Sequence, residues 1–515
     1  QVDGAITGSS TINGVGIISN ITNFSNGILI SGDGSTGTLS TASNNTGLGT
    51  SVFDDLTTGD GNTGVGTASL EKLTTGSNNT AVGYNSQAVN TTGSQNTSYG
   101  RLSLDALTTA DDNTAIGNAA MTANTTGADN TSVGSGSMRA NTTGAYNVAV
   151  GKDALDANTT ASNNVAVGYD SLSANTTGGD NVALGFEAMK ANTTGVANVA
   201  IGKAALDANT TANSNTAIGK LSLTANTTGA SNTGVGAESL EANTTGTQNA
   251  AVGHKSLEAN TTGAENVAVG VEALQANTTG GSNTAIGMRA LEANTTAGNN
   301  TAVGVAAMMV NTTGTFNVAV GANALDANTS GNNNVALGRR ALSANTTGTE
   351  NISIGSDALL VNTTGSRNTA IGYGCLDANT TAGNNTAVGN NAMTANTTGY
   401  DNVAVGRNAL DANVGGHSNT SVGESSLTSN TEGDRNIAIG QNAMAVNTTG
   451  GENVGIGRNA LDANTTASNN TAVGDSALTA NTTGHSNVGV GHSALAANTT
   501  ATSNTTVGAS ALLVN

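Results

Sequence analysis

The chain has 515 residues, of which 70 are Gly, none is Pro or Trp, 2% are aromatic and 10% are charged. Aromatic side chains carry much of the buried area of compact domains, so this composition excludes a large spherical core and argues against a conventional enzyme. The net charge of −19 argues against nucleic acid or an anionic membrane as a partner, because both bind clustered Lys and Arg. The single Cys375 excludes an intrachain disulfide framework and a Cys-based zinc site, and no apolar run reaches the roughly 18 residues of a membrane span.

The first 44 residues form a segment of their own. Apolar runs at 15–18 and 28–30 stand between Gly and Asn turns, which predicts a β-rich region. Because this segment lacks the periodicity of the rest, we interpret residues 1–44 as a cap or assembly segment. The start at Gln1 rather than Met suggests a processed or partial N-terminus.

From Asn45 onward the chain repeats every 17 residues, in 28 copies that run to Asn504 and beyond. Numbered from its first residue, each copy has Asn at position 1 and Gly at position 5, and position 4 is Val, Ile or Leu in every copy except at Tyr99. Position 9 is Leu or Met except at Phe53 and Gln87, whereas positions 6, 7, 10, 16 and 17 vary and hold most of the charge. Similar copies also recur at an offset of 85 residues, which indicates duplication of five-copy blocks.

The repeat predicts an all-β, parallel β-solenoid or β-roll of about 28 coils over residues 45–515. Asn-Thr-Ala-Val-Gly alternates in side-chain direction and favours a strand, and the closing Asn-Thr-Thr-Gly is typical of a turn. We expect two short strands in each coil, at positions 1–5 and about 7–11, with corners at the Gly of position 5 and at Asn-Thr-Thr-Gly. Seventeen residues with two turns leave no room for helices.

One coil cannot bury its own Val and Leu side chains, but stacked coils would bury them against one another. Each strand would bond to its equivalents about 4.8 Å above and below, so like residues would form ladders. We expect the position 4 Val/Ile ladder and the position 9 Leu/Met ladder to face each other inside, and position 1 to form an Asn ladder. Asn515 falls at position 12, so we expect either further sequence or another subunit to cover that end.

The repeat unit resembles known repeat arrays. Asn-Thr-Ala-Ile-Gly from Asn113, with Ala-Met and Asn-Thr-Thr-Gly after it, is similar to the repeats of phage and bacterial tail-fibre proteins. Asn-Val-Ala-Val-Gly at Asn147 and Asn402 resembles, more distantly, the head repeats of trimeric autotransporter adhesins. These resemblances cover residues 45–515 and imply a fibrous, extracellular, trimeric or stacked assembly.

The Asn-Thr-Thr triplet occurs 21 times at positions 12–14, and each triplet is a glycosylation sequon by pattern. Leu56, Leu73 and Leu107 occupy position 12 in early copies, so we favour a corner held by Asn and Thr hydrogen bonds over a glycan site.

Other candidate sites have structural explanations. Position 10 is acidic in 12 copies, which could bind Ca²⁺, but its variation favours a solvated face. The His residues share no ladder, so we expect no metal site, and Cys375 replaces Ala or Ser at position 8. Adjacent Thr residues point to opposite sides of a strand, which argues against an ice-binding array. The four His residues are His254, His417, His485 and His492.

The sequence therefore predicts a non-enzymatic structural protein, with no catalytic, cofactor or metal residues, in an extracellular filament or adhesin. Its expected partners are further copies of itself, as a trimer or end to end, and cell-surface glycans or a receptor. A phage tail or appendage fibre is the alternative, and a tailspike glycosidase would need a cleft with converging carboxylates that the sequence does not reveal.

Overall fold

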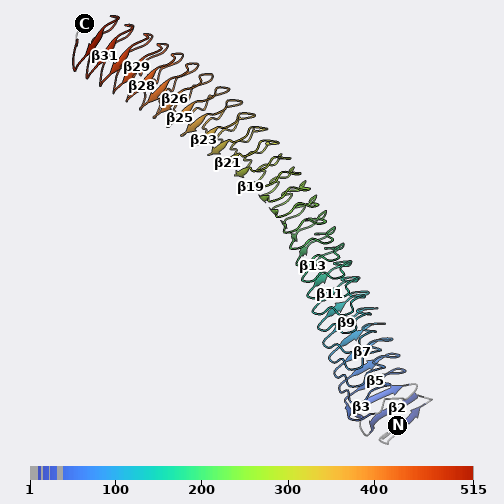
Figure 1. The fold of residues 1–515 in the computed structure, drawn as a ribbon. Helices are drawn as coiled ribbons and strands as arrows, with labels where there is room; N and C mark the ends of the chain where they lie inside the picture. The colour runs from blue at the N-terminus through green and yellow to red at the C-terminus, as the bar shows by residue number, and fades with distance from the viewer. Residues whose placement is uncertain (1–9, 13–14, 22–23, 32–38, 514–515) are drawn as a thin grey trace. The chain divides into compact units, whose positions relative to one another are not determined.

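The computed structural model describes residues 10–12, 15–21, 24–31 and 39–513. As the repeat predicts, these residues form an all-β parallel solenoid of about 28 turns spaced about 17 residues apart, without helices in the described part (Figure 1). The chain divides into two compact units, which are Gln1–Lys255 with Asn260–Thr262, and Ser256–Ala259 with Gly263–Asn515. The two units are described one at a time.

In the first unit, strands β5 to β17 each hold positions 2 to 4 of one copy. From β5 to β16, each pairs in parallel with the strand 17 residues further on, so that identical positions meet, as Thr131 meets Val148 and Val133 meets Val150. The strands are β5 (Thr46–Leu48), β6 (Thr63–Val65), β7 (Thr80–Val82), β8 (Thr97–Tyr99), β9 (Thr114–Ile116), β10 (Thr131–Val133), β11 (Val148–Val150), β12 (Val165–Val167), β13 (Val182–Leu184), β14 (Val199–Ile201), β15 (Thr216–Ile218), β16 (Thr233–Val235) and β17 (Ala250–Val252).

The second unit repeats this arrangement with the strands β18 to β32. The register again joins equivalent positions, as in Val318 with Val335 and Val320 with Leu337. The strands are β18 (Val267–Val269), β19 (Thr284–Ile286), β20 (Thr301–Val303), β21 (Val318–Val320), β22 (Val335–Leu337), β23 (Ile352–Ile354), β24 (Thr369–Ile371), β25 (Thr386–Val388), β26 (Val403–Val405), β27 (Thr420–Val422), β28 (Ile437–Ile439), β29 (Val454–Ile456), β30 (Thr471–Val473), β31 (Val488–Val490) and β32 (Thr505–Val507).

The chain's first strands lie at the N-terminal end of the first unit. β1 (Ser10–Ile12), β2 (Val15–Ile21) and β3 (Phe24–Ser31) pair in antiparallel order. β3 then runs parallel to β4 (Ala42–Ser43) and to β5, which joins this meander to the first coil. Both apolar runs of the sequence lie in these strands. The assignment of residues 1–44 as a cap stays a prediction, and residues 1–9, 13–14, 22–23, 32–38 and 514–515, with Asn515, lie outside the described residues.

The second predicted strand, at positions 7–11, is wrong. Those residues form consecutive turns, because positions 7 and 9 both adopt the left-handed conformation, as at Asn323 (φ 55°) and Leu325 (φ 54°). The turns still bond between coils. The Leu325 N–H donates to Ala341 O at 3.0 Å, and the Ala327 N–H donates to Ser343 O at 3.0 Å. Hydrogen bonding between rungs therefore continues outside the strands.

The predicted side of position 4 is also wrong. In each strand position 3 is buried and positions 2 and 4 face outward, so Ala319 has no exposed surface whereas Val320 is 39% exposed. Position 9 does point inward, and Leu325 is fully buried, as predicted. Position 11 lies on the outside where it is Val361, which is 39% exposed. The interior is filled by Leu or Met from the turns, against small residues from the strands.

The first coils show why the strand side must be small. Phe53 and Val52 are the bulkiest pair at positions 9 and 8, and Gly47 and Gly64 stand at position 3 beside them. A Cβ at Gly47 would lie 3.1 Å from Val52 Cγ1 and 3.2 Å from Phe53, closer than side chains normally approach. The interior of one coil therefore holds large side chains at positions 8 and 9 only where position 3 of the strand is small.

Two ladders of buried Asn side chains run through each unit. At position 1, the Asn334 N–H donates to Asn317 Oδ1 at 2.9 Å, which confirms the predicted ladder. At position 12, Asn328 Nδ2 donates to Asn311 Oδ1 at 2.8 Å and to Gly331 O at 3.0 Å. At position 13, Thr329 Oγ1 donates to Thr346 O at 3.0 Å. Because these buried amide groups have hydrogen-bond partners, they stabilise the stacking of equivalent positions in successive coils.

Candidate contact surfaces

The outward side of the strands is an exposed, mostly apolar surface. We define the outer sheet face as the side chains at positions 2 and 4 of the coils. Position 4 keeps large exposed groups along both units, including Ile116, Leu184, Ile286 and Ile439. Because each strand lies in register with the next, the side chains of each position stack in a column.

No charged residue occupies the outer sheet face. Positions 2 and 4 hold only Thr, Val, Ile, Leu, Ala or Tyr in all 28 copies. The chain nevertheless has 34 acidic and 15 basic residues, and within the coils they lie at other positions. An exposed apolar surface of this extent makes the outer sheet face a candidate contact surface.

Position 6 borders this face across the Gly corner and carries scattered aromatic side chains. Tyr169 and Phe186 stack with ring centroids 5.4 Å apart. Lys152 lies over the Tyr169 ring, 5.2 Å from its centroid, and Lys203 lies 5.7 Å from the Phe186 centroid. These four side chains occupy position 6 of four successive coils, so they stack as two aromatic rings between two Lys side chains.

Opposite charges pair one coil apart on the variable positions. Arg340 and Asp357 approach to 2.8 Å, and Arg139 and Asp156 also to 2.8 Å. Arg407 pairs in the same way with Glu424. Where both partners are exposed, such a pair stabilises a fold little, by about 0–1 kcal/mol. They do neutralise most of the basic residues, which leaves the surface acidic.

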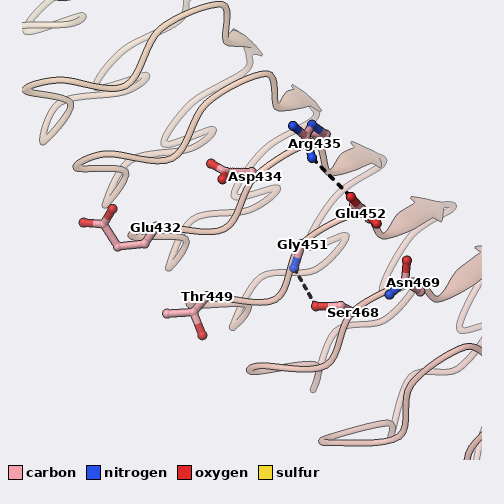
Figure 2. A pocket seen from close by; sticks show the side chains of 8 residues that line it. All are labelled: Glu432, Asp434, Arg435, Thr449, Gly451, Glu452, Ser468 and Asn469. Carbon is pink, nitrogen blue, oxygen red and sulfur yellow. Dashed lines mark hydrogen bonds and ion pairs between the residues drawn. The ribbon is translucent and has the colours of Figure 1, made fainter.

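The corner at positions 14, 16 and 17 has a shallow recess of about 310 Å³ in the second unit, shown in Figure 2. The recess exists because Gly451 has no side chain where neighbouring coils carry Asp434 and Ser468. Glu432 and Thr449 line one side, and Arg435, Glu452 and Asn469 line the other.

The recess is acidic, but its charges are largely paired. Arg435 and Glu452 approach to 3.2 Å, and the Gly451 N–H donates to Ser468 Oγ at 3.0 Å. Asp434 Oδ1 accepts the His417 N–H at 2.8 Å, and His417 Nε2 lies 3.2 Å from Asp434 Oδ2. The recess can make hydrogen bonds and charge contacts with a polar group.

The remaining His residues do not join a shared site. His417 stacks on Tyr400 with centroids 4.8 Å apart, and this pair belongs to the wall of coils beside the recess. His485 contacts Ser486, and His254, His485 and His492 are exposed. All four His residues lie at the variable positions 6 and 16, and the expectation that they hold no metal stays a prediction.

The Asn-Thr-Thr triplets place their Asn side chains inside the coil. Asn328, Asn345 and Asn362 are fully buried, and their amide groups donate to the neighbouring Asn and to the corner carbonyl. A glycan needs an exposed amide nitrogen, so this geometry favours the corner interpretation of the triplet.

Position 10 carboxylates lie half-buried beside the turns. Burial raises the pKa of Asp105, Asp156, Asp207, Asp377 and Asp462, each in a different coil. Position 10 is therefore less solvated than the sequence indicated. Cys375 is fully buried at position 8, where its Sγ lies 3.2 Å from Ala387 O, and burial raises the pKa of its thiol to about 12. This thiol is a packing group.

No family model and no curated protein matches the chain. In the described part of the chain, no helix has the length and apolar character that a bilayer span requires. The resemblance to tail-fibre and adhesin repeats therefore stands on the repeat motif alone.

Proposed function

We propose that the chain is a non-enzymatic structural protein, a β-solenoid spacer in an extracellular fibre or filament whose copies associate with one another. The observation that carries the proposal is that the residues that recur in the copies are those that hold one coil on the next. Asn at positions 1 and 12, Gly at position 5, Leu or Met at position 9 and Thr at position 13 all serve the stacking of coils. Little of the recurrent sequence is left to build a catalytic cleft.

The variable positions support a role in contact. Positions 6, 7, 16 and 17 lie outside and change from coil to coil without disturbing the ladders. A spacer of this kind can present different groups at different heights, including the recess around Gly451. We therefore propose cell-surface glycans or a receptor as partners in adhesion, besides further copies of the chain.

A deletion in register tests the spacer architecture. Removing residues 283–367 takes out five whole coils and joins Ser282 to Asn368, which keeps every ladder in phase. We expect a folded protein that is shorter by about 24 Å, at about 4.8 Å per coil, measured by small-angle X-ray scattering. Removing residues 283–362 instead joins Ser282 to Thr363 out of phase and is expected to lower the melting temperature sharply. Equal behaviour of the two deletions would contradict a stacked spacer.

The cellular setting needs a separate test. Immunogold electron microscopy of native material, with antibodies against the purified chain, is expected to label filaments outside cells. Label on virion appendages would instead favour the alternative, a phage tail fibre that binds a host surface. Label confined to the cell interior would contradict both proposals. New reducing ends after incubation with polysaccharide would support a tailspike glycosidase, and we expect none.

A further inference from the structure

We propose that the outer sheet face is the surface on which a second copy of this chain packs. This inference rests on the proposed structural function and deepens it, because it assigns the contact between copies to named side chains. The face consists of the position 2 and position 4 columns, for example Val318 and Val320 of β21.

The first argument compares exposed positions within the same copies. Positions 6 and 17 are exposed and have accepted Lys, Arg, Asp or Glu many times, as at Arg339, Glu350 and Arg367. Positions 2 and 4 face solvent in the same coils and have accepted none in 28 copies. Duplication alone would have preserved all these positions equally. A requirement outside the single chain therefore keeps the outer sheet face free of charge.

The second argument concerns the partner. Two chains that each carry a charge of −19 repel one another, and a face without charges is where they can approach without burying an unpaired carboxylate. The side chains of successive strands also form ridges on this face, and neighbouring ridges are about 4.8 Å apart, the spacing of paired strands. Another stack of in-register coils has the same spacing, so a second copy can match it rung for rung, as paired sheets do in dry interfaces.

The available area is close to that of a standard interface. A rung of about 4.8 Å and a width of about 10 Å give about 50 Å² per coil, so the 15 strands β18–β32 of the second unit offer roughly 700 Å². A standard stable interface buries about 800 Å² on each partner. One unit therefore approaches this size with its outer sheet face alone.

Charge placed on the face tests the proposal, and the chain offers a matched control. The test variant carries Ile286→Lys, Val303→Glu and Val320→Lys at position 4 of three successive coils. The control carries the same charges at position 6 of the same coils, as Met288→Lys, Val305→Glu and Ala322→Lys. Opposite charges one coil apart already pair in this fold, so both variants should fold, and circular dichroism melts check this.

Sedimentation equilibrium of the full chain then measures assembly. We expect wild type and control to reach at least twice the monomer mass of 49.9 kDa, and the test variant to dissociate with at least a tenfold weaker constant. A wild-type chain that stays monomeric at all concentrations would overturn the proposal, and so would a test variant that assembles like wild type. A monomer could still be a spacer, and the in-register deletion tests that claim independently.

Crosslinking keeps the proposal testable if the charged variant fails to fold. In a Cys375→Ala background, Val320→Cys on the face is expected to give bismaleimide-linked chains, whereas Ala322→Cys at position 6 is not. Equal crosslinking at the two sites would place the interface elsewhere. Binding of monomeric wild type to an insoluble polysaccharide, lost in the charged variant, would show a different occupant and overturn the proposal.

Discussion

The two halves of each coil build the interior in different ways. The strand half, positions 1–5, alternates its side chains: positions 1 and 3 are buried, as with Asn317 and Ala319, and positions 2 and 4 face outward. The turn half, positions 6–12, uses left-handed residues at positions 7 and 9, so that two neighbours, Ala324 and Leu325, both face inward. The strands therefore supply the bonding edge and an outer face, while the turns supply most of the core volume.

This difference explains which residues recur. A left-handed conformation at a non-Gly residue costs about 1–2 kcal/mol, and Leu accepts it at position 9 because the turn places its side chain in the core. The strand half has no such strain, but its corner Gly321 has φ 138°, a conformation that only Gly adopts readily.

Replacing the corner Gly is expected to have the largest effect. In Gly321→Ala, the new Cβ would lie 2.5 Å from Gly338 O and the residue would keep an unfavourable φ of 138°. We expect a loss of about 2–5 kcal/mol in the free energy of unfolding, measured by urea denaturation.

Gly331→Ala is the matched control in the same coil. Its Cβ would lie 2.3 Å from Gly348 O, a closer contact than at Gly321, but its φ is not positive. Ala occupies the same position 15 naturally at Ala297 and Ala382, so the backbone there can shift to accept it. We expect a much smaller loss. Equal losses at both sites would show that the contact, and not the backbone conformation, requires Gly.

Truncation on the two faces tests the division between inside and outside. Leu325→Ala leaves a cavity in the core and is expected to cost about 2–5 kcal/mol in chemical denaturation. Val320→Ala, in the same coil, removes a partly exposed side chain and is expected to cost under about 0.5 kcal/mol when copies are too dilute to assemble. A larger loss at Val320 would mean that position 4 packs inside.

Exchange of Asn and Leu at position 12 tests the second Asn ladder. Asn328→Leu removes the bonds from Asn328 to Asn311 and Gly331 and one of the two acceptors of Asn345 Nδ2, so we expect a loss of about 1–3 kcal/mol. Leu107 stands at the same position between Asn90 and Asn124, and Leu107→Asn should complete the ladder there without loss. If Asn328→Leu melts like wild type, the ladder contributes nothing to stability.

The period of the repeat was sufficient to predict the solenoid, because a fixed 17-residue spacing forces equivalent residues to stack. It also predicted the Asn ladder at position 1 and the buried Leu at position 9. The alternation rule failed at positions 7–11, since left-handed residues at positions 7 and 9 abolish the period of two that a strand would have. No local signal marks this conformation, because Leu rarely adopts it.

The side of position 4 was mispredicted for a related reason. Hydrophobicity suggested that Val and Ile face inward, but the width of one coil cannot hold Leu325 and Val320 together, so Ala319 fills the interior. The sizes of the side chains at positions 3 and 9, taken together, indicate which side of the strand faces inward. Gly47 opposite Phe53 is one signal, and Ser98 beside Gln87 is another, since Gln87 Nε2 donates to Ser98 Oγ at 2.9 Å. Contact surfaces on the outside could not be foreseen until the inside was assigned correctly.

The smallest expected effect concerns charge beside the turn half. Burial raises the pKa of Asp462, so the folded state favours its protonated form. Its contribution to stability is therefore full below the ordinary carboxyl pKa and is lost as the pH rises through the raised value. Asp462→Asn should leave the melting temperature unchanged near pH 3 and raise it slightly at pH 7.

Asp475 gives the opposite sign at position 6, next to the strand half. A hydrogen bond from Ser476, with help from Arg458, lowers the pKa of Asp475, so its contribution exists above the ordinary carboxyl pKa and disappears as the pH falls. Asp475→Asn should therefore lower the melting temperature slightly at pH 7 and leave it unchanged in acid. Calorimetric scans of both variants across this pH range separate the two cases, because shifts of the same sign would mean that burial beside the turns does not decide the behaviour of Asp462.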